Sequence, residues 1–263
     1  DSLLNDKAIT CRMPYANKTK ELEPFTDCTA LSSGWVWNTP LWSRIGTGYV
    51  FSSQFQTDEE SWSEFNTYLR KRFDKKRVED AEFNFVPFKT GKYKRGWVGN
   101  CLALTLASGF IEPLESTGLA LACYQINHFI EAIKDGECSA FNKKLYNREL
   151  DKSFEEIYNF VLLHYVNTKR EDSTYWKHIK NTLEIPNSLS DYVANEKSGE
   201  WFPRKSRESI LIGINGNAEY SPKHLMYNNK WVMKCNKKEQ ENILADLNYF
   251  KLRKEWHTEK TYK

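Results

Sequence analysis

The sequence predicts a mixed α/β (α+β) fold in which a sheet-containing part precedes a mainly helical part. Aromatic and β-branched residues, which favour strands, are concentrated at 35–53 and 83–88. Apolar residues recur at helical spacing over 119–133 and again over 154–165. A chain of 263 residues is long enough to hold one large domain or two smaller ones.

The first elements should be short strands followed by one helix. The residues before Trp35 include two prolines and predict short strands and turns. Residues 35–53 predict two strands that flank a turn at 46–48, where the sequence is Gly-Thr-Gly. Thr57 and Glu60 have the spacing of a capping box, so we expect a helix to begin there and to end near residue 72.

The middle of the chain predicts further strands and one amphipathic helix. Phenylalanines frame a strand over 83–88, a turn follows it, and 93–98 should be its partner. The apolar run 102–106 predicts a buried strand. A polar stretch comes next, and the helix over 119–133 follows it with one apolar stripe.

After Gly136 the pattern becomes helical. The longest amphipathic segment covers 154–165, and 199–235 looks irregular. Further helical patterns cover 173–183, 188–197 and 243–250. We therefore place a domain boundary near residue 140, with a mixed-sheet domain over 1–140 and a mainly helical domain over 141–263.

Composition excludes several classes of function. The net charge of +3 is too small to indicate nucleic-acid binding, and basic clusters at 70–77 and 89–95 predict solvated surface. No apolar run reaches membrane-span length and no signal peptide is visible, so we expect no membrane partner. The six cysteines lack metal-binding spacing, which predicts no metal site and a reducing cytoplasm; Cys101 and Cys123 should be small core residues.

The stretch Ser-Gly-Phe-Ile-Glu-Pro-Leu-Glu-Ser-Thr-Gly at 108–118 is the strongest candidate for a functional site. It places Glu112, Glu115, hydroxyls and a glycine just before a long helix. The free N–H groups at a helix start attract anions. We expect Glu115 to be functional, and Glu112 to bond to backbone or to a basic neighbour.

A second motif pairs Trp35 with Trp37, which would face the same side of a strand. By spacing alone, this is a pair of core residues. With its surroundings, however, the chain resembles the flavin-dependent tryptophan halogenase family. The matching segments are Gly34-Trp35-x-Trp37-x-x-Pro40, Arg44-x-Gly46-x-Gly48-Tyr49-Val50-x-Ser52-Ser53, 109–118, His164-Tyr165, Arg170-x-Asp172 and Tyr175-Trp176.

The resemblance implies an FAD-binding, flavin monooxygenase-like fold followed by a helical substrate domain. The family uses reduced FAD, supplied by a separate flavin reductase, and oxygen to convert halide into hypohalous acid. That acid crosses a tunnel and halogenates a small electron-rich aromatic such as an indole. Glu115 matches the catalytic Glu, and Thr117 and Gly118 match positions beside flavin and halide. Pro113 and Ser116 join them at the cofactor, and Trp35, Trp37 and Pro40 match the tunnel.

The departures from the family pattern are equally informative. No GxGxxG loop occurs, and no Lys here inherits the role of the family's catalytic Lys. We therefore expect a C-terminal portion of a halogenase with little catalysis by itself. Two alternatives stay open: a related flavin monooxygenase that hydroxylates, and a truncated inactive or binding-only protein. A homodimer stays open as well, whereas the substrate, its regioselectivity and the halide preference are not indicated.

Overall fold

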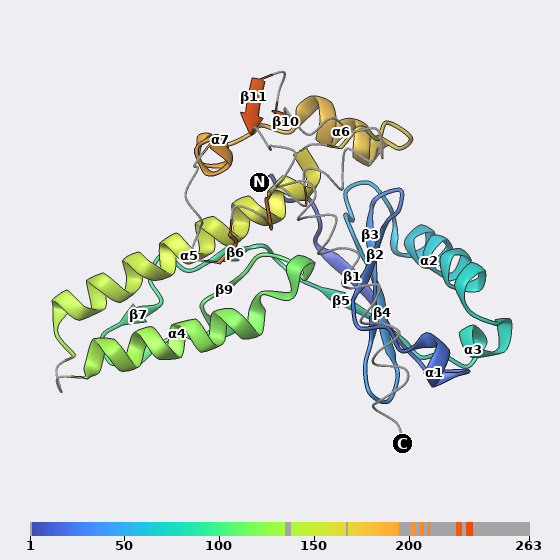
Figure 1. Cartoon of the computed structure of the whole chain (residues 1–263), viewed down its shortest axis with the longest axis horizontal. Coiled ribbons are helices and arrows are strands. Elements are labelled where there is room, and N and C mark those ends of the chain that lie inside the picture. The colour runs from blue at the N-terminus through green and yellow to red at the C-terminus, as the bar shows by residue number, and fades with distance from the viewer. Residues whose placement is uncertain are drawn as a thin grey trace, which may run out of the picture.

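The computed structural model describes residues 2–134, 138–166, 168–194, 201–203, 206–207, 210, 225–227 and 230–233. Its centre is a five-stranded sheet with the order β2-β3-β4-β1-β5, and every neighbouring pair is antiparallel. Helices α2 and α3 cover one face of this sheet, and the helical part lies on the other side (Figure 1). The strands of the sheet are β1 (Lys7–Met13), β2 (Asp27–Ala30), β3 (Gly34–Pro40), β4 (Ile45–Phe51) and β5 (Phe83–Pro87).

Short elements connect the sheet to two long helices. Two small strand pairs and two 3-10 turns complete the first half. The pairs are β6 (Gly91–Lys92) with β9 (Gly109–Phe110) and β7 (Trp97–Val98) with β8 (Cys101–Leu102), and the turns are η1 (Thr105–Ala107) and η2 (Leu114–Ser116). The helices are α1 (Lys18–Glu21), α2 (Asp58–Arg72), α3 (Lys75–Glu79), α4 (Gly118–Ile133), α5 (Ala140–Val166), α6 (Thr174–Thr182) and α7 (Asn187–Ala194). A separate hairpin consists of β10 (Leu225–Tyr227) and β11 (Lys230–Met233). Helices α4 and α5 run antiparallel, so the end of α5 lies near the start of α4 (Figure 1).

Two buried clusters lie on opposite faces of the sheet because strand side chains alternate. Val36 and Tyr49 belong to the cluster that contains Phe65 of α2. Trp35 and Val50, one position along each strand, belong to the cluster formed with α5 and α6. The alternation predicted for the Trp-x-Trp motif is therefore confirmed: both indoles face the helical side.

Several local predictions are confirmed. Thr57 caps α2 with the full capping box, in which Glu60 N donates to Thr57 Oγ1 and Thr57 N donates to the Glu60 carboxylate. The helices predicted at 119–133, 154–165, 173–183 and 188–197 are present within one or a few residues at most ends, although α5 begins much earlier, at Ala140. The helix predicted at 243–250 lies outside the described residues.

Other local predictions are wrong. Residues 46–48 lie inside β4, and the turn is at 41–44. The predicted strand pair of 83–88 with 93–98 does not form, because β5 pairs with β1 and completes the large sheet. The predicted strand at 102–106 is a two-residue strand followed by a 3-10 turn, with Leu106 73% exposed.

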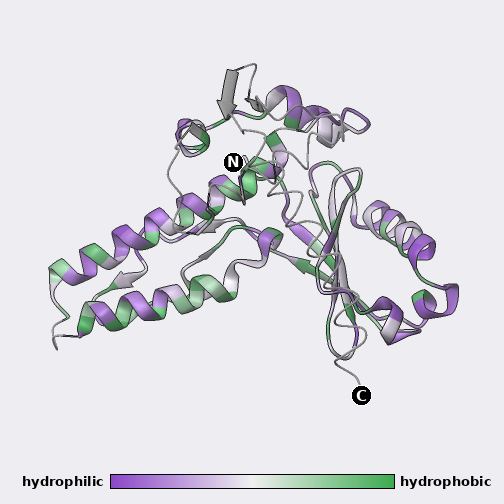
Figure 2. Cartoon of the chain, viewed as in Figure 1, coloured by the Kyte–Doolittle hydropathy of each residue, from purple (hydrophilic) through white to green (hydrophobic). Residues whose placement is uncertain are grey.

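The apolar stripe of α4 is the clearest difference from the prediction. Leu119 is 84% exposed and Ile130 52% exposed, whereas Leu121 and Gln125 are the buried residues of this helix. The helix therefore packs through a different face from its most apolar one, and hydrophobic positions appear along its surface (Figure 2). The two cysteines predicted for the core, Cys101 and Cys123, are also exposed. Among the described helices, none is both long and apolar enough to cross a bilayer.

Candidate active site

The turn between β9 and α4 contains two adjacent residues in a strained backbone conformation. Glu115 has φ 67° and ψ 0°, and Ser116 has φ 53°. A left-handed conformation costs a non-glycine residue about 1–2 kcal/mol. Strain of this kind persists only where the surroundings hold it, and it concentrates at functional sites.

A buried glutamine holds the segment that leads into this turn. Gln125 of α4 accepts from the N–H of Thr105 at 2.7 Å and donates to Ser108 Oγ at 2.7 Å. Ser108 Oγ in turn donates to the carbonyl of Thr105 at 2.7 Å. Because Gln125 and Ser108 are both 1% exposed, these bonds are sheltered from water and fix the turn against α4.

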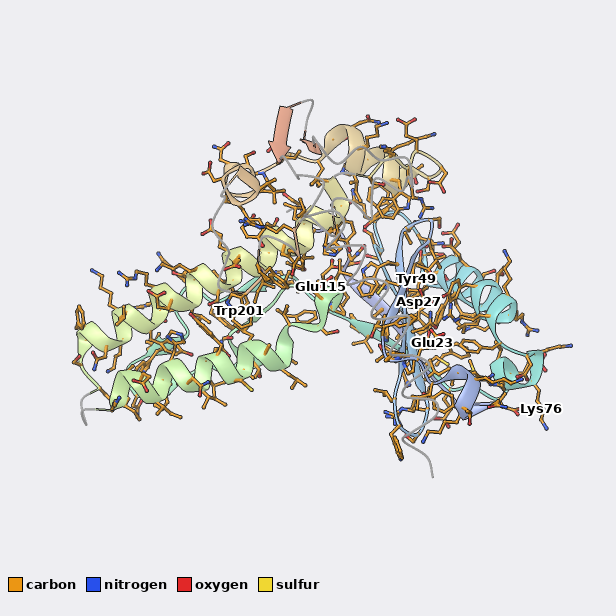
Figure 3. The ribbon with its side chains drawn as sticks, in the orientation of Figure 1. Glu23, Asp27, Tyr49, Lys76, Glu115 and Trp201 are labelled. Atoms are coloured by element: carbon orange, nitrogen blue, oxygen red, sulfur yellow. The ribbon has the colours of Figure 1, made fainter. Side chains whose placement is uncertain are left out.

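Glu115 projects from this turn toward the end of α5, and it lies at the end of α4 nearest the sheet (Figure 3). Its Oε1 is 3.0 Å from Nε2 of His164. The other ring nitrogen of His164, Nδ1, lies 2.9 Å from the carbonyl of Phe160, which can only accept. Both ring nitrogens of His164 therefore have an oxygen within hydrogen-bond distance, which orients the imidazole toward Glu115.

Glu112 is buried in a different direction, and the prediction of a backbone or basic partner is wrong. Its Oε1 accepts from Tyr165 Oη at 2.6 Å and from Trp35 Nε1 at 3.2 Å. Its Oε2 accepts from Asn5 Nδ2 at 3.5 Å. Burial raises the pKa of this carboxyl to about 7, although the three donors and the nearby His164 favour the ionised form.

The start of α4 opens into a cavity of about 330 Å³. Thr117 is the N-cap residue but makes no side-chain capping bond, and the first turn contains no acidic residue. The free N–H groups and the helix dipole therefore favour an anion here. A Cβ placed on Gly118 would meet no atom within 4 Å, so the chain leaves the backbone accessible at this point. The cavity is lined by Glu112, Thr117, Gly118, Phe110, Phe154 and Ile157, among others.

The lining of this cavity fits a halide and a flat flavin ring, the groups that the family resemblance implies. Its volume falls within the range of ligand pockets, and apolar walls with a few polar groups suit a flat ring system. Thr117 and Gly118 line it; Glu115, Pro113 and Ser116 belong to the adjoining turn but do not line it.

The predicted tunnel residues are only partly brought together. The ring centroids of Trp35 and Trp37 are 6.0 Å apart with 55° between the ring planes. Trp37 lies directly across from Gly48 of β4, where a Cβ would fall 2.1 Å from its ring. Pro40 is at the opposite end of β3 and lines a separate cavity with Lys20 and Arg72, away from the turn.

Residues that the sequence did not assign a role complete the site. His164 and Tyr165 belong to the family-like segments but no function was predicted for them, and Asn5 was not identified. All three lie far from the turn along the chain, so no local sequence pattern indicated that they would contact it. Arg170 and Asp172, which belong to another family-like segment, form an ion pair at 2.7 Å.

Comparison with known proteins gives one consistent answer. A family model described as tryptophan halogenase matches residues 1–233. The tryptophan 7-halogenase RebH of Lentzea aerocolonigenes is 32% identical over 199 residues, covering 76% of this chain and 36% of that protein. The tryptophan 6-halogenase SttH of Streptomyces toxytricini is 32% identical over 197 residues, covering 75% of this chain and 36% of that protein.

Solved structures agree with this fold. Tar14, a tryptophan C-6 flavin-dependent halogenase from taromycin biosynthesis, superposes with a TM-score of 0.72 at 30% identity. That match covers 98% of this chain and 50% of Tar14. This chain thus spans about a third of the length of the relatives RebH and SttH, and half of the length of Tar14.

Proposed function

Because this chain belongs to the tryptophan halogenase family, we propose that it forms the Glu115-bearing part of a flavin-dependent halogenase active site. The observation that carries the proposal is the Glu115 carboxylate on a strained turn, paired with His164 and placed beside an uncapped helix start. The substrate class is a small electron-rich aromatic such as an indole.

The proposed roles follow the chemistry of each group. Thr117 and Gly118 would hold halide and flavin at the cavity, because helix-start N–H groups bind anions and Gly118 permits close approach. Pro113 and Ser116 would contribute to the cofactor side of the turn. Reduced FAD, delivered by a flavin reductase, supplies with oxygen the oxidising power that converts halide into hypohalous acid. Trp35 and Trp37 would form the wall between the flavin side and the substrate side of the site.

Glu115 would act where the aromatic ring meets hypohalous acid. The ring carbon attacks the halogen, the carbon–halogen bond forms, the oxygen–halogen bond breaks, and hydroxide leaves; the proton that the ring then loses through Glu115 converts this hydroxide into water. The ring then loses its own proton to the Glu115 carboxylate, and general base catalysis typically contributes about 10²–10⁴-fold. His164 holds the carboxylate in place and shares the proton with it.

The test compares Glu115→Gln with the unchanged chain, each joined to the flavin-binding part of a halogenase relative. With reduced FAD, oxygen and bromide, mass spectrometry of an indole substrate should show a brominated product that Glu115→Gln reduces at least about a hundredfold. Flavin binding should be unchanged. Full bromination by Glu115→Gln would eliminate the proposed role, and an oxygen adduct alone would favour hydroxylation.

The 263-residue chain by itself is the second arm of the same test. Because neither a glycine-rich loop nor the family's Lys occurs in it, we expect little or no product from it. Halide-dependent turnover by this chain alone would contradict that expectation. A cytoplasmic location is part of the same proposal.

A further inference from the structure

A buried polar cluster lies beside the site, and of its members only Trp35 has a role in the proposed function. Its members are Glu112, Trp35, Tyr165, Asn5 and Tyr175, none of which is more than 6% exposed. They come from five different segments: the turn before α4, β3, α5, the residues before β1, and α6. Buried networks of this kind are costly unless every group is satisfied.

Glu112 is the acceptor on which the network converges. The hydroxyl of Tyr165, the indole N–H of Trp35 and the amide of Asn5 all donate to its carboxylate. Asn5 Nδ2 also donates to Tyr165 Oη at 2.9 Å, and Asn5 Oδ1 accepts from Tyr175 Oη at 3.0 Å. An ionised carboxylate only accepts, so it satisfies three converging donors better than an amide or a hydroxyl would.

The two carboxylates of the turn grip two neighbouring residues of one helix. Glu112 binds Tyr165, and Glu115, three residues later, binds His164. The strained turn is therefore attached to α5 on both sides of Pro113. Glu112 also accepts from the indole N–H of Trp35 at 3.2 Å, and the Tyr165 hydroxyl lies close to the same N–H.

We propose that Glu112 is a positioning residue, which holds the Trp35 indole and α5 so that the tryptophan wall and the Glu115 carboxylate keep one relative geometry. The meaning of this role for catalysis rests on the proposed function. The clamp itself, meaning the bonds of Glu112 to Tyr165, Trp35 and Asn5, does not rest on the proposed function, because it is made entirely by residues of this chain.

The clamp should depend on pH. The groups that face Glu112 are Tyr165 and His164 on α5, Tyr175 on α6 and Trp35 on β3. Of these, His164 is occupied by Glu115, and the burial of both tyrosines raises the pKa of each hydroxyl well above its usual value. Because burial raises the pKa of Glu112 to about 7, its protonation removes acceptor capacity and loosens the bond to Trp35 near neutral pH.

The test uses the indole N–H signals of the full chain labelled with ¹⁵N-tryptophan. The Trp35 signal, assigned with Trp35→Phe, should shift with a midpoint of about pH 7 as Glu112 ionises. In Glu112→Gln the signal should lose this transition but stay near its hydrogen-bonded position, because the amide oxygen still accepts. In Glu112→Leu the signal should lose the transition and move away from its position in the unchanged chain, because the carboxylate acceptor is gone.

Two further variants keep the test decisive. Glu115→Gln is the matched control: it removes a carboxylate three residues away that does not contact Trp35, so the transition should persist. If Glu112→Leu does not fold, Tyr165→Phe removes one of the three donors to Glu112, together with the acceptor of Asn5, and should shift the midpoint without abolishing the transition. A Trp35 signal that still titrates in Glu112→Gln would overturn the proposal. A signal that neither Glu112→Leu nor Tyr165→Phe changes would also overturn it. If the Trp35 signal refutes the clamp but bromination is normal, the proposed function stands. If bromination fails but the Trp35 signal titrates as expected, the clamp stands.

Discussion

Two glycines of β4 should respond in opposite ways to the same substitution. At Gly48 an added Cβ would lie 2.1 Å from the Trp37 ring and 2.5 Å from the backbone carbonyl of Ile9. The ring could move, but the carbonyl belongs to the neighbouring strand β1 and cannot. Overpacking costs about 1–3 kcal/mol, so we expect Gly48→Ala to lower the free energy of unfolding by about 3 kcal/mol.

Gly46, two residues earlier on the same strand, is the matched control. Its added Cβ would meet Leu41 at 3.7 Å and the Thr39 carbonyl at 3.8 Å, which are ordinary contacts. Gly46→Ala should therefore stabilise the chain by about 0.4–1 kcal/mol through the unfolded state. Urea unfolding followed by circular dichroism measures both variants. A Gly48→Ala variant within about 0.5 kcal/mol of Gly46→Ala would refute the packing of Trp37 against Gly48.

Two other predictions concern the turn and the cavity. Burial raises the pKa of Glu112 from 4.5 to about 7, so the protonated form favours the folded state. The free energy of unfolding is therefore highest below about pH 4.5 and falls as pH rises to about 7, although the ionised carboxylate, once formed, holds its three donors more tightly. This pKa difference corresponds to about 3 kcal/mol. Glu112→Gln should therefore reduce the change in unfolding free energy between about pH 5 and 8 by about that amount. Glu155→Gln, at an exposed position, is the control and should not. Gly118→Val should leave the unfolding free energy within about 0.5 kcal/mol, because no atom lies near its Cβ position. In a flavin-binding form of the protein the same change should weaken flavin retention, measured by absorbance; unchanged retention would contradict the proposed approach of the flavin to Gly118.

Local signals predicted the elements well where near neighbours decide the conformation. The capping box at Thr57 depends on residues three apart, and it forms as expected. The helix after the polar stretch begins at Gly118, directly after the predicted turn. By contrast, Gly48 was predicted to be a turn residue because glycines are common in turns. Its role is instead to leave room for Trp37 on the neighbouring strand, and only the register of β3 and β4 reveals this.

The sequence by itself determined that the chain has a sheet followed by helices, that Trp35 and Trp37 share a face, and that Glu115 stands before a helix start. These follow from periodicity and capping, which are set by residues close together in the chain. Only the tertiary structure decided that Glu112 is the buried carboxylate, that His164 faces Glu115 and that the apolar stripe of α4 is not its packed face. The first two outcomes depend on contacts between residues 49 to 107 positions apart, and no local pattern encodes which distant groups will meet.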